Sequence, residues 1–263
     1  MTNGGSGGAR AAHHTGQAPH AYRFDWGLAG LHALVPHADI VIIVDVLRFT
    51  SAVSAALEAG GSVLPHPWNH DNATAFAAER GAVLAGRRED GGPSLSPTDL
   101  LTMAAGTRVV LPSPNGSALT CAAVEHGARR VLAGCLRNAT ATAAFARRNV
   151  GLRGVIAVVA AGERWDAADG PLRMAVEDLL GAGAILAALD PSGAVGSPCS
   201  SPEARAARAA FSDARPQLYE HLRRCASGLE LAERGWDDDV ATSSALDVTN
   251  IVAELVDGIF RPA

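Results

Sequence analysis

One unit of secondary structure recurs along the middle of the chain, and it constrains the fold more than any other feature. In this unit a short apolar run ends in a polar turn, and a helix of small residues follows. The clearest example is Ile40–Val44, a β-branched run that ends at Asp45 and precedes a predicted helix over Thr50–Ala59. Such a run is typical of a strand buried on both faces.

The same unit returns three times further along. The predicted strands are Val109–Leu111, Val131–Ala133 and Val155–Val159, and the predicted helices are Ala118–His126, Ala139–Arg147 and Arg173–Leu189. Weaker strands are predicted at Ser62–Leu64 and Ala82–Ala85. Alternating strands and helices with connections of this length predict an α/β fold with three layers, α/β/α, around a mostly parallel sheet.

Three regions follow from changes in composition. Residues 1–20 are rich in Gly, Ala, Ser and His and lack the apolar core of a signal peptide, so we expect a disordered tail. Residues 21–190 hold the repeated unit and form the sheet domain. Residues 191–263 are predicted to be a helical segment that packs on the sheet domain or forms a small second lobe.

The chain contains no lysine, so all 22 basic residues are arginine. This excludes a Walker-type phosphate loop, a Schiff-base aldolase and a pyridoxal-phosphate enzyme. An anion held by a cationic side chain is therefore held by arginine, which suits phosphate, sulfonate or carboxylate. A general drift toward arginine codons explains the bias itself, but the exclusion stands.

Charge, hydropathy and cysteine usage restrict the partners and the location. The net charge of -5 comes without a basic patch, so nucleic acid is not an expected partner. No apolar run is long enough to cross a membrane. The four cysteines form neither a CxxC pair nor a disulfide framework, and a reduced cytoplasmic location is expected. A homodimer is one expectation for the assembly.

Polar turns at the ends of the four strands predict a common binding crevice. In parallel sheets, ligands bind beyond the carboxyl ends of the strands, where helix N-termini present free N–H groups to anions. Thr50, Ser51, Ser117 and Thr140 are residues of the helix-capping type. Each alone is explained as an ordinary cap, whereas four at one edge favour a binding site.

Familiar catalytic motifs are absent from these turns. No GxGxxG follows a strand, and no Ser lies in a GxSxG elbow. Neither Cys121 nor Cys135 has an arginine six residues later, as a cysteine phosphatase would. The strand that ends at Asp45 has Leu47 where an aspartyl-phosphate phosphatase carries its second Asp.

What remains at the crevice is a set of acids, arginines and amides. A carboxylate at Asp45, the end of a buried strand, requires a partner or a metal ion, and Arg48 is close enough to pair with it. Asn115 supplies an amide, and Glu177 and Asp178 supply oxygen ligands of the kind that magnesium prefers. The alternatives are a structural Asp45–Arg48 pair, a plain turn at Asn115 and an acidic helix start at Asp237–Asp239.

In these residues the chain resembles the 2-phosphosulfolactate phosphatase family, from about Phe24 to Arg261. The resemblance rests on short motifs in a fixed order: Asp45–Arg48, Ala85–Arg88, Leu95–Pro97, Asn115–Ser117, Asn138–Ala139, Ala161–Gly162, Glu177–Asp178, Ala182–Gly183 and Ser227–Gly228. It implies a three-layer α/β fold and magnesium-dependent hydrolysis of 2-phosphosulfolactate, or of a close analogue, to the hydroxy acid and phosphate.

The resemblance and the crevice together yield one set of candidate residues and one small phosphorylated or sulfonated acid as the substrate. The predicted catalytic residues are Asp45, Arg48, Arg88, Asn115 and Glu177; the predicted substrate-binding residues are Thr50, Ser51, Ser96, Gly116, Ser117 and Asn138; and the predicted Mg²⁺ ligands are Asp45 and Asp178.

Two departures from the family pattern leave alternatives open. Arg87 stands where members commonly carry Glu, and Leu95 stands where they commonly carry Asn. The chain therefore lacks one acid and one amide at the crevice. A phosphatase for a different phosphorylated carboxylic acid is one alternative, and a non-catalytic anion-binding relative is the other.

Overall fold

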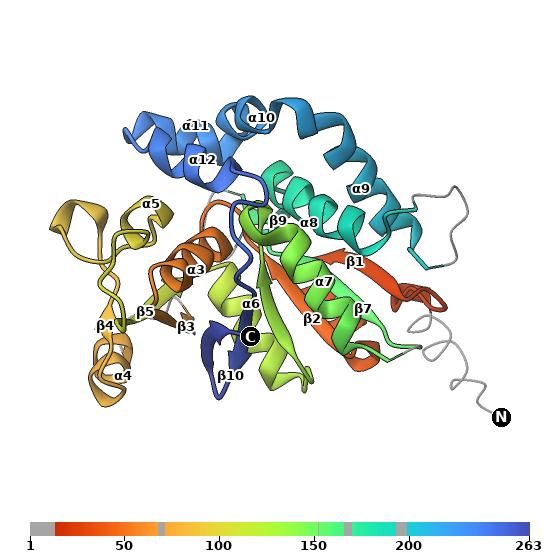
Figure 1. Cartoon of the computed structure of the whole chain (residues 1–263), viewed down its shortest axis with the longest axis horizontal. Helices are drawn as coiled ribbons and strands as arrows, with labels where there is room; N and C mark the ends of the chain where they lie inside the picture. Colours follow the sequence, from red (N-terminus) through yellow and green to blue (C-terminus); the bar gives the residue numbers. More distant parts are fainter. Residues whose placement is uncertain (1–13, 68–71, 152, 166–169, 193–198) are drawn as a thin grey trace.

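A nine-stranded sheet forms the centre of the protein in a computed structural model that describes residues 14–67, 72–151, 153–165, 170–192 and 199–263 (Figure 1). In spatial order the strands are β1 (Tyr22–Trp26), β7 (Ile156–Ala160), β2 (Ile40–Val44), β6 (Val131–Gly134), β10 (Ala253–Val256), β11 (Ile259–Pro262), β3 (Ser62–Pro67), β5 (Arg108–Ser113) and β4 (Val83–Leu84). A separate two-stranded ribbon pairs β8 (Glu163–Arg164) with β9 (Leu172–Arg173).

Helices connect the strands and cover the sheet. They are α2 (Gly27–Leu34), α3 (Phe49–Glu58), α4 (Ala73–Glu79), α5 (Pro97–Leu100), α6 (Gly116–Glu125), α7 (Ala139–Asn149), α8 (Val176–Leu189), α9 (Pro202–Ala214), α10 (Leu218–Arg224), α11 (Ala226–Glu233) and α12 (Asp237–Ser244). Short 3-10 turns lie at Arg88–Asp90 and Leu136–Asn138. No helix in the described ranges is long and apolar enough to span a bilayer.

The β2 strand shows why the sequence builds three layers. All five of its residues are buried, because helices lie on both faces of the sheet. Ile40, Ile42 and Val44 point to one face and join the apolar core of α7, α8 and α9. Val41 and Ile43 point to the other face and pack with α2 and α6. The predicted α/β fold with three layers is confirmed.

The sheet consists of two parallel parts joined by a hairpin. Strands β1, β7, β2 and β6 are parallel to one another, and so are β3, β5 and β4. The β10–β11 hairpin lies between these parts and pairs antiparallel with β6 on one side and β3 on the other. Its two-residue turn, Asp257–Gly258, has positive φ at both positions, as a type I′ turn requires.

The C-terminal segment therefore differs in part from the helical segment predicted for residues 191–263. Helices α9 to α12 follow one another over one end of the sheet in Figure 1, but the chain then returns to the sheet as β10 and β11. The Asp-Gly turn between two apolar runs is the local signal for this hairpin. Helices α11 and α12 are called the roof below.

Part of the predicted disordered tail is also ordered on the sheet. Residues 1–13 lie outside the described residues. Within 14–20, the buried Gln17 side chain donates a hydrogen bond to the Phe24 carbonyl at 2.6 Å. Arg23 of β1 donates to the Gly16 carbonyl at 2.5 Å. Residues 14–20 thus lie along the edge of β1.

Candidate functional site

The site is centred on Asp45, which follows β2 and is only 5% exposed. Its two carboxylate oxygens accept hydrogen bonds from the backbone N–H groups of Phe49, at 3.2 Å, and Gly116, at 2.8 Å. These N–H groups belong to the first turns of α3 and α6. Two helix N-termini therefore meet at one buried carboxylate.

Glycine is required at position 116 by this close approach. A Cβ atom there would overlap Phe49 and would lie 2.7 Å from Asp45 Oδ2. The absence of a side chain lets the backbone N–H of Gly116 reach the carboxylate. The Asn115–Gly116 turn is therefore part of the site and does more than reverse the chain direction.

Asp178 is the second buried acid and connects two of the predicted turns. It lies in the first turn of α8 and accepts hydrogen bonds from Val46 N–H at 2.7 Å and Gly162 N–H at 2.9 Å. Val46 follows β2, and Gly162 follows β7. Burial raises the pKa of Asp178 well above its usual value, and the negative charges of Asp45 and Glu177 raise it further.

Four acids interact electrostatically here: Asp45, Glu163, Glu177 and Asp178, called the acid cluster below. Burial raises the pKa of Asp45 to about 7, and the charges of Glu163 and Glu177 contribute to the rise. Burial also raises the pKa of Glu163, although a hydrogen bond from Asn115 opposes this. Glu177 is buried, and its Oε2 lacks a hydrogen-bond partner in the described residues. The raised pKa values show that the charged carboxylates are unfavourable here without compensation, and a nearby cation would stabilise them in their charged form.

A pocket of about 200 Å³ opens onto this cluster. Asp45 and Glu163 line its acidic side, and Arg48 and Arg234 line it as well. The remaining lining residues are Leu47, Leu95, Ser113, Pro114, Asn115, Ser227, Glu230 and Leu231. The pocket therefore combines acids, arginines, an amide and hydroxyl groups, which is the chemistry expected for an anion held near a cation.

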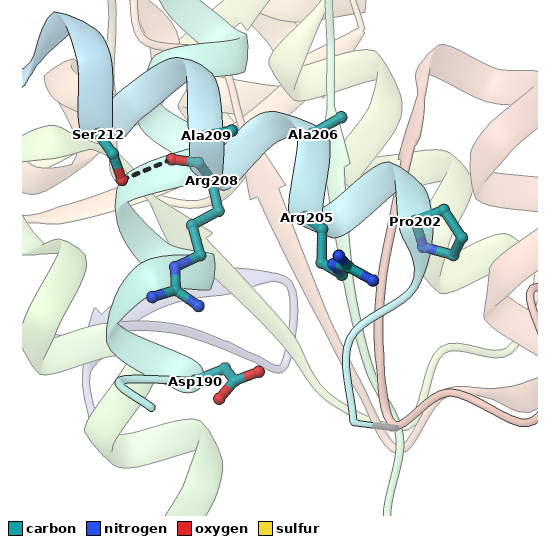
Figure 2. A pocket seen from close by; sticks show the side chains of 7 residues that line it. All are labelled: Asp190, Pro202, Arg205, Ala206, Arg208, Ala209 and Ser212. Atoms are coloured by element: carbon teal, nitrogen blue, oxygen red, sulfur yellow. Dashed lines mark hydrogen bonds between the residues drawn. The ribbon is translucent and has the colours of Figure 1, made fainter. Parts of the chain in front are cut away.

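A second pocket, of about 590 Å³, lies beside α9 and the end of α8 (Figure 2). Arg205 and Arg208 of α9 and Asp190 are among its lining residues, and the Ser212 hydroxyl donates to the Arg208 carbonyl at 3.0 Å. No member of the acid cluster lines this pocket. The smaller pocket is therefore the candidate site.

Arginine residues from distant segments are held together by acids of α12. Arg48 Nη1 donates to Asp239 Oδ2 at 2.6 Å, and Arg88 pairs with Asp238 at 2.5 Å and with Asp239 at 3.6 Å. The hydrogen bond to Asp238 raises the pKa of Arg88. Arg48, which lines the pocket, thus pairs with Asp239 rather than with Asp45.

The predicted binding hydroxyls hold the turns in place. The Thr50 hydroxyl donates to the Asp45 carbonyl and the Ser51 hydroxyl to the Val46 carbonyl, both at 2.8 Å. The Ser117 hydroxyl donates to the Leu111 carbonyl at 2.6 Å. The Ser96 hydroxyl donates to Asp239 Oδ1. These four side chains are buried and do not line the pocket, and their role in substrate binding stays a prediction.

The turn that follows β6 lies away from the pocket. Asn138 is fully buried, accepts from Cys135 N–H at 3.0 Å and donates to the carbonyls of Ala133 and Ile251. The neighbouring Arg137 donates to Glu58 at 2.6 Å and to the Thr242 carbonyl at 3.0 Å. The turns after β2, β5 and β7 thus contact one another, whereas this turn joins α3 to α12.

Several residues of the site are not among those predicted from the sequence. Glu163, Ser227 and Arg234 line the pocket, and Asp239 holds Arg48. The Gly162–Glu163 turn after a predicted strand was a signal for the first of these. The others lie on the roof, and nothing local in the sequence places the roof over the pocket.

The electrostatics of the acid cluster favour a magnesium ion, although its side chains do not form a complete set of metal ligands. Within the described ranges, no three His, Cys, Asp or Glu side chains form a group that could hold a metal ion. Magnesium usually keeps several waters and needs only one or two carboxylates together with substrate phosphate. The unpartnered Oε2 of Glu177 and the raised pKa of Asp45 are the observations that fit such an ion.

Comparison with known proteins identifies the family. The model of the family described as 2-phosphosulpholactate phosphatase matches residues 31–258. The chain belongs to this family. The match spans α2 to the β10–β11 turn and so includes the acid cluster, Arg48 and the roof. The resemblance drawn from the short motifs is confirmed.

Two family members show the extent of the similarity. The chain is 31% identical over 220 residues to a probable 2-phosphosulfolactate phosphatase of Thermus thermophilus, a match that covers 81% of this chain and 85% of the relative. It is 31% identical over 225 residues to a 2-phosphosulfolactate phosphatase of Methanothermobacter thermautotrophicus, covering 83% and 88%. The family is one of phosphatases, and the chain is accordingly a phosphoric monoester hydrolase.

Proposed function

We propose that the protein hydrolyses 2-phosphosulfolactate, or a close analogue, to the hydroxy acid and phosphate in a magnesium-dependent reaction. The observation that carries this proposal is the buried Asp45 carboxylate, which lies on a charged pocket where the first turns of α3 and α6 meet. Membership of the family and the names of the two relatives support the choice of substrate.

Asp45 and Glu163 are the members of the acid cluster that line the pocket, and they would hold the magnesium ion. A bound magnesium ion polarises phosphoryl oxygens and offsets their negative charge. Asp178 was predicted as a ligand, but it does not line the pocket, and its two oxygens accept hydrogen bonds from Val46 N–H and Gly162 N–H. We therefore assign Asp178 to fixing the turns after β2 and β7. Glu177 does not line the pocket, and its charge, which acts on Asp45, would stabilise the cation without binding it.

The other pocket residues orient the ester. Arg48 is held by Asp239 and presents its guanidinium group to the pocket, where it can bind an acidic oxygen. Asn115 lies beside Glu163 and limits the positions that this carboxylate can adopt. Arg88 was predicted as catalytic, but it does not line the pocket. It pairs with Asp238 and Asp99 and would act by holding Asp239.

Release of inorganic phosphate tests the activity directly. The purified protein is assayed with 2-phosphosulfolactate, 2-phospholactate and glycerol 2-phosphate, each with magnesium and with EDTA. We expect turnover of the acidic esters with magnesium and its loss with EDTA. Turnover that EDTA leaves unchanged would contradict the metal role, and folded protein that hydrolyses no ester would favour the non-catalytic anion-binding alternative.

A phosphatase for a different carboxylic acid is the second candidate, and Leu95 favours it. This apolar side chain lines the pocket, so one wall offers no hydrogen bond to a sulfonate. Faster turnover of 2-phospholactate than of 2-phosphosulfolactate would support this candidate. A cytoplasmic location and a homodimer stay predictions. Sedimentation velocity would measure whether the protein is a dimer.

A further inference from the structure

One side of helix α11 faces the candidate site. Ser227, Glu230, Leu231 and Arg234 all line the pocket. Their spacing of three, four and seven residues places them on one side of a helix. Because Asp45 and Glu163 line the same pocket, these two carboxylates form one side of it and the roof forms a second side.

Ser227 brings an unused hydrogen-bonding group to this side. The residue is only 8% exposed, and its Oγ atom has no hydrogen-bond partner in the part of the chain that the structure describes. Buried hydroxyl groups in proteins are nearly always paired, because an unpaired one has lost its hydration without compensation. A ligand oxygen in the pocket would supply the missing partner.

Arg234 brings a positive charge that is held in place. Its Nη2 atom donates to Glu230 Oε1 at 2.6 Å, one turn back on the same helix. Its guanidinium carbon lies 5.4 Å from the centre of the Trp236 ring, and that of Arg48 lies 4.8 Å from the same ring. One indole ring thus holds two guanidinium groups that both line the pocket.

The two sides of the pocket suit two different acidic groups. A phosphoryl group can lie against Asp45 and Glu163 only if a cation lies between them. Another acidic group of the ester, which has no cation beside it, is repelled by the acid cluster. It is attracted to the side of the pocket that Arg48 and Arg234 line. A hydroxyl group and two planar guanidinium groups are suitable donors for a sulfonate or a carboxylate.

We propose that Ser227 of α11 and Arg234, the residue that follows α11, form with Arg48 the subsite for a sulfonate or carboxylate group of the phosphate ester. This inference rests on the proposed function and specifies which substrates the site prefers. Arg234 is then a residue that determines specificity, and Trp236 positions it. A phosphate ester with neither a sulfonate nor a carboxylate gains nothing from this subsite.

The test measures kcat/KM for 2-phosphosulfolactate and for glycerol 2-phosphate in three variants. The variants are R234Q, S227A and the matched control R224Q, which removes the arginine of a similar i,i+4 Glu–Arg pair on α10, away from the pocket. We expect R234Q to lower kcat/KM for 2-phosphosulfolactate by about 10- to 100-fold, the size of one hydrogen bond to a charged group. S227A should lower it by about 5- to 10-fold.

For glycerol 2-phosphate, which has neither a carboxylate nor a sulfonate, we expect changes below about 3-fold in R234Q and S227A, and R224Q should leave the turnover of both esters unaffected. Equal losses for the two esters, or no loss for either, would overturn the subsite. Such a result would leave the phosphatase activity itself in place.

Binding of sulfolactate separates failure of the subsite from failure of the proposed function. This acid carries no phosphate, so calorimetric titration measures the subsite without turnover. If the wild-type protein hydrolyses neither ester, about 10-fold weaker sulfolactate binding in R234Q than in R224Q still supports the subsite. Equal binding by the wild type and R234Q, or no binding by the wild type, would refute it.

Discussion

Asp239 Oδ2 accepts a hydrogen bond from Arg48 Nη1 at 2.6 Å and thereby joins α12 to the turn that follows β2. Asp239 is fully buried, and its Oδ1 accepts from the Ser96 hydroxyl at the start of α5. One carboxylate therefore holds the roof, the pocket arginine and a loop from the far part of the sheet in a fixed arrangement.

Replacing Asp239 by Asn should destabilise the protein and weaken substrate binding. Removal of one partner from a buried ion pair costs about 3–5 kcal/mol, because the remaining charge stays buried without compensation. Urea unfolding should show a lower free energy of unfolding by roughly this amount, and KM should rise as Arg48 loses its position. Asp257→Asn, at the exposed hairpin turn, is the control and should change neither quantity.

Gly116→Ala should impair the site by displacing Asp45. The new methyl group would lie 2.7 Å from the Asp45 carboxylate and would overlap Phe49, so the backbone N–H of residue 116 could not keep its hydrogen bond. We expect kcat to fall at least about 10-fold and stability to fall by about 1–3 kcal/mol. Gly92→Ala, where a Cβ atom meets nothing within 4 Å, serves as the control; equal effects in both variants would contradict the steric argument.

Asp45 should make the metal-free protein less stable as the pH rises. Its pKa is about 7 in the folded protein, compared with about 3.9 when unfolded, so the folded state holds the proton more tightly. The stabilisation is complete below pH ~4 and is lost as the pH rises through 7. Relative to Asp45→Asn, the free energy of unfolding of the wild type should fall by up to ~4 kcal/mol over this range.

The measurement is urea unfolding in EDTA at several pH values between 4 and 8, with both proteins followed in parallel. Magnesium added at pH 8 should raise the midpoint of the wild type more than that of Asp45→Asn, because the variant keeps only one of the two carboxylates that would hold the ion. A constant difference between the two proteins at all pH values would show that Asp45 does not titrate in this range.

Glu177→Gln should separate stability from activity. Glu177 Oε2 is buried without a hydrogen-bond partner in the described residues, and its charge lies near those of Asp45 and Asp178. Removing this charge should stabilise the metal-free protein by about 1–2 kcal/mol and should lower kcat by about 10-fold or more. Thermal unfolding in EDTA and phosphate release with magnesium measure the two effects, and a destabilised but fully active variant would contradict this role.

The sequence allowed the parts of the site that depend on one strand and its turn to be predicted. The β-branched run of β2 identified Asp45, and the acid pair at the start of α8 identified Glu177 and Asp178. Asn138 was predicted at the crevice, but it lies away from the pocket, where it donates to the carbonyl of Ile251 in the distant segment that leads into β10. Local patterns show where strands end but not which ends meet.

The position of the roof over the pocket could not be predicted from the sequence either, because local patterns do not show which distant segments meet. Ser227 and Arg234 lie on a short helix whose sequence would suit any exposed helix, and only the packing of α11 over the pocket gives them a role. Gly228 shows how closely α11 approaches α10, since a Cβ atom there would overlap the Leu222 carbonyl. Contacts between segments more than a hundred residues apart, such as Arg48 with Asp239, fix this arrangement.

The position of the β10–β11 hairpin also bears on how the protein is made. Residues 253–262 leave the ribosome after all the other strands of the sheet. They nevertheless lie in the middle of the sheet, between β6 and β3. Until they arrive, the nascent chain carries two incomplete sheets, each with an open edge that can pair with another molecule. Protection from aggregation during synthesis therefore matters most in the interval before this hairpin closes the gap.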